Sequence, residues 1–94
     1  MPASREHYNT GVHVGKIRVR FPRGGTATIE VSCGFCNRDK GKHRFHVSGG
    51  GSGMTQKEFA AYRDAKLRAD PANGGDIRTA KSLLEKAGAE VLWA

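Results

Sequence analysis

Two stretches of alternating apolar and polar residues, joined by a turn sequence, constrain the fold of this chain most strongly. Residues 16–21 and 26–32 each place an apolar side chain at every second position, which is the period of a strand with one buried face. The segment Pro22-Arg23-Gly24-Gly25 between them is typical of a tight turn. Together they predict an antiparallel β-hairpin. The exposed side of its first strand would carry a row of cations: Lys16, Arg18 and Arg20.

The residues that follow the hairpin predict one more strand and then two helices. Residues 44–47 predict a third strand, and the glycine-rich residues 48–53 predict a flexible connection. Thr55 and Glu58 form the T-x-x-E pattern of a capping box at the start of a helix that ends before Pro71.

A second helix is predicted over residues 77–87, where apolar residues recur at helical spacing with Asp76 as the N-cap. Residues 89–93 predict a closing strand or an apolar tail packed on the core. The chain therefore reads as one small α+β domain. Its expected parts are a partly flexible lead-in (residues 1–15), a basic β region (16–47), a glycine-rich connection (48–53) and two helices with a C-terminal strand (54–94).

The positive charge of the chain is concentrated in its N-terminal half. The net charge is +7, and residues 1–47 hold nine basic and three acidic side chains, against seven and six in residues 48–94. A polyanionic partner is therefore expected to meet the first half. Neither a secretory signal nor an apolar run of membrane-spanning length is evident, and we expect an intracellular protein in a reducing compartment, away from membranes.

A cysteine and histidine cluster carries the strongest chemical signal. Residues 33–46 read C-x2-C-x6-H-x2-H, and thiolates and imidazoles are the ligands of tetrahedral structural zinc. We therefore predict a structural Zn²⁺ that clamps the turn of the β region. The expected ligands are Cys33, Cys36, His43 and His46.

This segment resembles a zinc knuckle or short zinc finger. Its fourteen residues match the length of a retroviral-type CCHC knuckle, with an aromatic residue between the cysteines and cations in the loop. Gly41 stands where the knuckle has its histidine, and His46 stands in place of its last cysteine. The resemblance implies binding of single-stranded nucleic acid, with aromatic rings stacked on bases. It covers this segment and no other part of the chain.

The spacing of the two histidines leaves the ligand set open. His43 and His46 are three residues apart, so an extended strand would point them to opposite faces. Both can ligate if the backbone turns near His43, and otherwise His7, His13 or water takes one position. A thiol oxidoreductase is a competing interpretation of C-G-F-C, but the residues after it are poor helix formers.

These features predict a non-enzymatic zinc module that binds nucleic acid, either DNA or RNA. A metallonuclease would need an open metal position and a general base, for which the sequence offers little. The competing hypothesis is a protein-binding inhibitor or adaptor that docks on an acidic surface of a larger complex. The expected nucleic-acid contacts are Lys16, Arg18, Arg20, Phe35, Arg38, Lys40, Lys42 and Arg44.

Overall fold

The structure, a computed structural model, describes residues 4–37 and 42–93. Within these residues, five strands form one antiparallel sheet and two α-helices pack on it, which confirms the α+β prediction. The strands are β1 (Ser4–Glu6), β2 (His13–Arg20), β3 (Thr26–Asn37), β4 (Lys42–Ser52) and β5 (Glu90–Trp93). The helices are α1 (Gln56–Arg68) and α2 (Ile77–Lys86), with the 3-10 turn η1 (Pro71–Asn73) between them.

The predicted hairpin is the centre of the sheet. Strands β2 and β3 pair from Gly15 opposite Val31 to Arg20 opposite Thr26, and β4 continues the sheet beyond β3. Strands β1 and β5 share the other edge of β2. The expected lead-in is therefore corrected from residue 4 onward, because β1 pairs with the start of β2 and satisfies the backbone polar groups of that edge.

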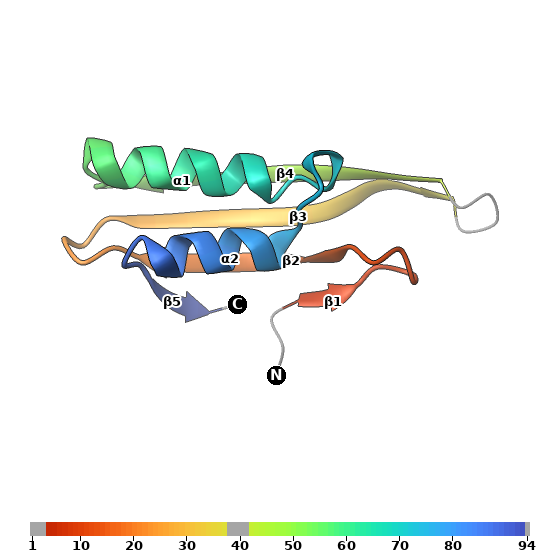
Figure 1. Cartoon of the computed structure of the whole chain (residues 1–94), viewed down its shortest axis with the longest axis horizontal. Helices are drawn as coiled ribbons and strands as arrows, with labels where there is room; N and C mark the ends of the chain where they lie inside the picture. The colour runs from red at the N-terminus through yellow and green to blue at the C-terminus, as the bar shows by residue number, and fades with distance from the viewer. Residues whose placement is uncertain (1–3, 38–41, 94) are drawn as a thin grey trace.

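Both helices lie on the same face of the sheet, α1 against β4 and α2 against β2 and β3 (Figure 1). The predicted helix starts are confirmed, since Thr55 and Glu58 form a complete capping box and Asp76 caps α2. Alternate strand residues face the helices and form the core with small and apolar helix residues. The fully buried residues of β2 and β3 are Ile17, Val19, Ile29 and Val31, Phe21 follows β2, and the helices add Ala65, Ile77, Ala80 and Leu84.

The glycine run forms the second half of a strand, which corrects the expectation of a flexible connection over residues 48–53. Gly49 and Gly51 pair with Ile29 and Ala27 on the helix-facing side of the sheet. A Cβ on Gly49 would meet the carbonyl oxygen of Thr28, and one on Gly51 would lie 2.5 Å from that of Thr26. These glycines therefore allow close approach of the backbone and of α1, rather than flexibility.

The opposite face of the sheet has no helix over it in the part of the chain that the structure describes. In β2 the buried residues Ile17 and Val19 alternate with more exposed ones on the uncovered face, and in β4 the half-buried residues His43, Phe45 and Val47 alternate with exposed ones. The described helices include none of the length and apolar character needed to cross a bilayer.

Candidate metal centre

A β-bulge places both cysteines on one side of β3. The pairing of β3 with β4 shifts between Cys33 and Phe35, so that Gly34 is an extra residue in β3. In a regular strand Cys33 and Cys36, three residues apart, would point to opposite faces. The extra residue turns Cys36 to the same face as Cys33. Both side chains therefore lie on the face that carries the core residues Ile29 and Val31.

Gly34 also leaves room for a side chain of the neighbouring strand. A Cβ built there would collide with the ring of His46, whose Nε2 would be 2.8 Å away. Gly34 and His46 therefore share the uncovered face, on the far side of the sheet from the two thiols.

Strand β4 contributes His43 to the thiol side. His43 is the register partner of Cys36, whereas His46 pairs with Ser32 on the uncovered face. The backbone does not turn between the two histidines, since β4 is continuous from Lys42 to Ser52. The strand geometry thus separates His46 from His43, as its spacing of three residues implies.

A fourth donor comes from the N-terminal hairpin. His7 lies at the end of β1, where Thr10 N donates to His7 O at 2.9 Å and closes a turn. The central residues Tyr8 and Asn9 have φ values of 43° and 60°, the signs of a type I′ turn. This turn directs His7 towards the β3–β4 hairpin.

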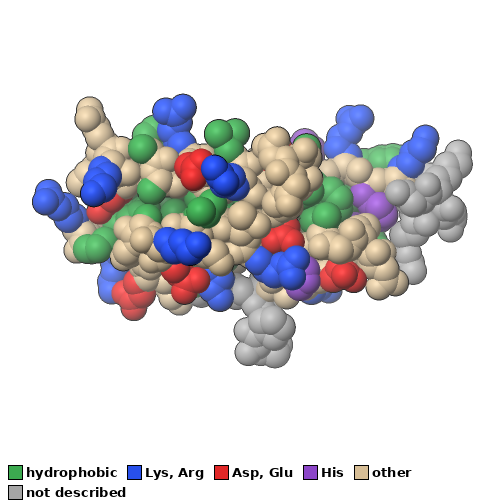
Figure 2. Space-filling model, viewed as in Figure 1, with side chains coloured by type: hydrophobic (Ala, Val, Ile, Leu, Met, Phe, Trp, Pro, Cys, Tyr) green, Lys and Arg blue, Asp and Glu red, His purple; other side chains and the backbone are tan. Residues whose placement is uncertain are grey.

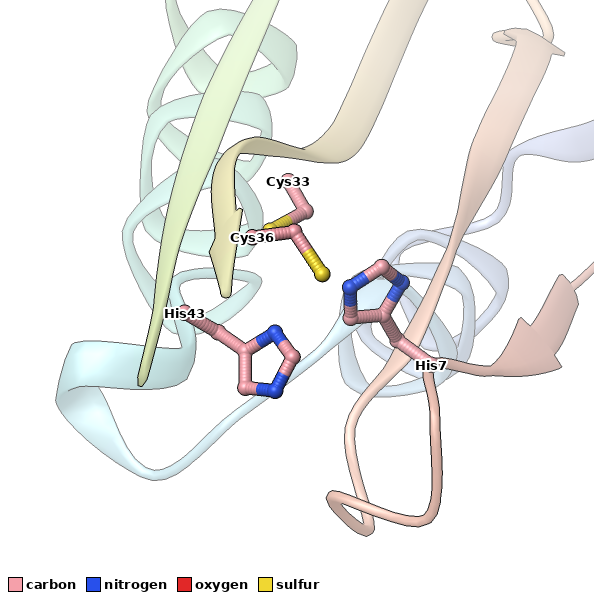
Figure 3. Close-up of side chains that lie close together, drawn as sticks. All are labelled: His7, Cys33, Cys36 and His43. Carbon is pink, nitrogen blue, oxygen red and sulfur yellow. The ribbon is translucent and has the colours of Figure 1, made fainter. Parts of the chain in front are cut away.

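The four side chains of His7, Cys33, Cys36 and His43 converge on one point beyond the ends of the helices. Each offers one donor atom, and these atoms all lie within 4.8 Å of one another. Figure 3 shows the Cys36 thiol directed between the two imidazole rings. In a tetrahedral zinc site the donor atoms are about 3.3 to 3.8 Å apart, so small side-chain rotations would close the cluster around an ion.

Two buried nitrogen atoms of the cluster are suited to bind a metal ion. His7 Nε2 and His43 Nδ1 are buried and have no hydrogen-bond partner among the described residues. Buried polar atoms are nearly always paired, and both nitrogens are suited to accept a metal bond. Burial lowers the pKa of His7, with further lowering by His43 and Arg5, which favours the neutral imidazole that a metal requires.

Aromatic rings surround this cluster. The ring of Phe45 lies 5.5 Å from His7 and 6.2 Å from His43, and Tyr8 stacks on His43 at 6.2 Å, centroid to centroid. A tyrosine with positive φ costs roughly 1 to 3 kcal/mol of backbone strain, which points to a local function for this turn.

The structure therefore brings together three of the four expected ligands, Cys33, Cys36 and His43, and adds His7. His46 lies outside the group. His13, the other alternative, is also outside it and its Nδ1 lies 3.2 Å from Ser4 Oγ. His7 is remote in sequence from the C-x-x-C motif, and no spacing rule links the two. The sequence features that favour His7 as a ligand are the small number of histidines in the chain and the polar turn residues that follow His7.

The basic residues expected to contact nucleic acid lie apart from the thiol cluster. In register, Lys16, Arg18 and Arg20 of β2 and Lys42 and Arg44 of β4 occupy the uncovered face. Phe35 pairs with Arg44 there and is 55% exposed. Arg20 is bound to Glu90 at 3.1 Å, so part of its charge is neutralised. Arg38 and Lys40 lie outside the described residues.

Comparisons with protein-family models, curated proteins and solved structures found no match to this chain.

Proposed function

We propose that this chain is a zinc-stabilised module that binds nucleic acid on the uncovered face of its sheet. The observation that carries the proposal is that the two faces of the sheet carry different groups. The helices and the His/Cys cluster occupy one face, whereas the other presents cations from β2 and β4 beside an exposed aromatic ring, Phe35.

Zinc is the ion that the donor set suits best. Two thiolates and two imidazoles match the Cys₂His₂ composition of structural zinc sites and are too soft for calcium or magnesium. Four protein donors fill a tetrahedron and leave no position for a reactive water, which favours a structural role over a hydrolytic one. With two thiolates the loaded centre is neutral, so the positive charge of the chain is retained.

The zinc would fix the part of the sheet that extends beyond the helices. The paired ends of β3 and β4 extend past the helix pair, next to the β1–β2 turn (Figure 1). His7 belongs to that turn and the other three donors belong to the hairpin. The ion would therefore tie two hairpins together and hold Phe35 and Arg44 in place on the reverse side.

The uncovered face has the chemistry to meet phosphates. Lys16 and Arg18 line a shallow hollow together with Thr28, Ser48 and Gly50, and Glu30, the register partner of Lys16, adds one carboxylate to it. The helix side differs, because its basic and acidic side chains are interspersed (Figure 2). An anionic chain would find the more continuous set of donors on the sheet.

The test is a titration of zinc-loaded protein into a fluorescently labelled RNA of mixed sequence, read by anisotropy at several salt concentrations. Arg18→Ala and Arg44→Ala are each expected to weaken binding and to reduce the slope of log K against log salt by about 1. Arg63→Ala on α1, an exposed position of the helix side, is the matched control and should leave both unchanged.

Polyglutamate separates nucleic-acid recognition from general attraction to anions. The proposal expects it to compete poorly, because it lacks phosphates and bases. Equal competition by polyglutamate, or an equal effect of Arg63→Ala, would contradict nucleic-acid binding at this face and favour an acidic protein surface as the partner.

A further inference from the structure

The shape of the uncovered face restricts the form of nucleic acid that it can accept. Four neighbouring strands at a spacing of about 4.8 Å make a surface about 14 Å across, measured between the outer strand axes. The major groove of duplex DNA is about 12 Å wide and admits one helix or a two-stranded ribbon. The sheet is too broad for such a groove, and both described helices pack on its other side.

The face has the features of a track for an extended strand. Arg44, His46, Ser48 and Gly50 follow one another at every second position of β4, about 6.7 Å apart, and so span about 20 Å. A Cβ added to Gly50 would touch nothing within 4 Å, so the floor at this point is open. A flexible chain could lie along β4 with its phosphates towards Arg18 on β2.

One end of this track carries two rings. Phe35 is 55% exposed. The ring of His46 lies against Gly34, the residue that precedes Phe35. The bulge at Gly34 sets both positions, since it turns Phe35 to the face of Arg44 while both thiols remain on the other side. His46 is thereby displayed at the surface beside an exposed aromatic ring and a cation.

We propose that the ligand is single-stranded nucleic acid. Its bases would stack on the rings of Phe35 and His46, and its phosphates would contact Arg18. This inference rests on the proposed function and adds the place on the sheet where bases would stack and a role for His46. Bases within a duplex are already stacked on each other, so their faces are closed to protein rings. A single strand leaves those faces open, and aromatic side chains bind them with little dependence on sequence.

The experiment compares one labelled 12-nucleotide strand with the same strand annealed to its complement, at one salt concentration and with zinc-loaded protein. The single strand is expected to bind at least about tenfold more tightly than the duplex. Phe35→Ala should weaken single-strand binding by roughly 5- to 150-fold, the range seen for loss of one aromatic–base stack. His46→Ala should weaken it in the same direction, and Phe35→Trp should restore most of the affinity.

The control is Phe59→Ala, since Phe59 is 47% exposed but lies on α1, on the other side of the molecule. Zinc content of each variant, measured by native mass spectrometry, excludes loss of the ion as the cause. Equal affinity for strand and duplex, with Phe35→Ala harmless and Arg18→Ala harmful, would overturn this inference and leave the proposed function standing. Absence of binding to either form would overturn both.

Discussion

The imidazole rings of His7 and His43 lie 5.1 Å apart, centroid to centroid, and their planes are nearly perpendicular at 87°. Each ring has a buried nitrogen without a hydrogen-bond partner, and two thiols complete the group. The two histidines come from different hairpins, β1–β2 and β3–β4. An ion bound between them would therefore join segments that the sheet connects only through β2 and β3.

Zinc should stabilise the protein strongly. Free zinc at a hundredfold excess over its dissociation constant adds about 2.7 kcal/mol to the free energy of unfolding. For a domain of this size, that corresponds to an increase in Tm of roughly 10 to 20 °C. Calorimetry with zinc and with a chelator measures the shift, and Cys33→Ser should remove the response to zinc. A Tm that is independent of zinc would contradict a structural metal centre.

The glycine run offers a test of close packing with an internal control. Gly49→Ala is expected to destabilise the fold by about 1 to 3 kcal/mol, because the new Cβ meets the Thr28 backbone under α1. Gly50→Ala, one residue further along, places its Cβ in open space and should be neutral or stabilising by about 0.5 kcal/mol. Urea unfolding measures both. Equal effects would show that the run serves as a connection.

Asp76 links α2 to β2, and its removal should be costly. Its carboxylate accepts hydrogen bonds from the backbone N–H groups of Arg78 and His13 and pairs with the Arg78 guanidinium at 2.7 Å. Asp76→Ala removes the helix cap and leaves the His13 N–H unpaired. We expect a loss of about 1 to 3 kcal/mol in the free energy of unfolding, measured by urea denaturation at neutral pH.

The same carboxylate predicts how stability depends on pH. Burial raises the pKa of Asp76, but the hydrogen bonds from Arg78 and His13 and the charge of Arg78 outweigh it, and the pKa lies below its ordinary value. A lowered carboxyl pKa stabilises the folded state above the unfolded-state pKa of about 3.9, and this contribution is lost as the pH falls through the folded-state value.

Asp76→Asn cannot titrate and serves as the reference. The difference in unfolding free energy between the two proteins should be constant above about pH 5 and should shrink as the pH falls below about 4. Loss of zinc at low pH affects both proteins equally and cancels in this difference. A difference that stays constant down to pH 2 would show that Asp76 does not titrate with folding.

The sequence predicted those parts of the fold that depend on local patterns. The alternation in residues 16–21 and 26–32 and the capping box at Thr55 specify their elements without help from distant contacts, and the structure confirms them. The glycine run differs from its prediction because its role lies in the packing of α1 above it. Absence of a Cβ can mean either flexibility or close approach, and local sequence does not distinguish them.

The candidate site could be predicted only in part, because some of its features are local in sequence and others depend on the pairing of distant strands. The C-x-x-C motif indicated a metal, and the opposite directions of His43 and His46 followed from strand period. The bulge that brings Cys33 and Cys36 to one face depends on the register with β4, and the approach of His7 depends on the pairing of β1 with β2. Both are long-range features, which residue spacing within one segment does not encode.

The most direct test of the central claim is zinc stoichiometry and affinity in matched histidine variants, measured by native mass spectrometry and by competition with a chromophoric chelator. The wild-type chain is expected to bind one zinc ion, which the chelator removes. His7→Ala and His43→Ala should each weaken zinc binding by about a hundredfold or more, since each removes a ligand, whereas His46→Ala should bind as the wild type does. Loss of zinc in His46→Ala with full retention in His7→Ala would contradict the centre described here.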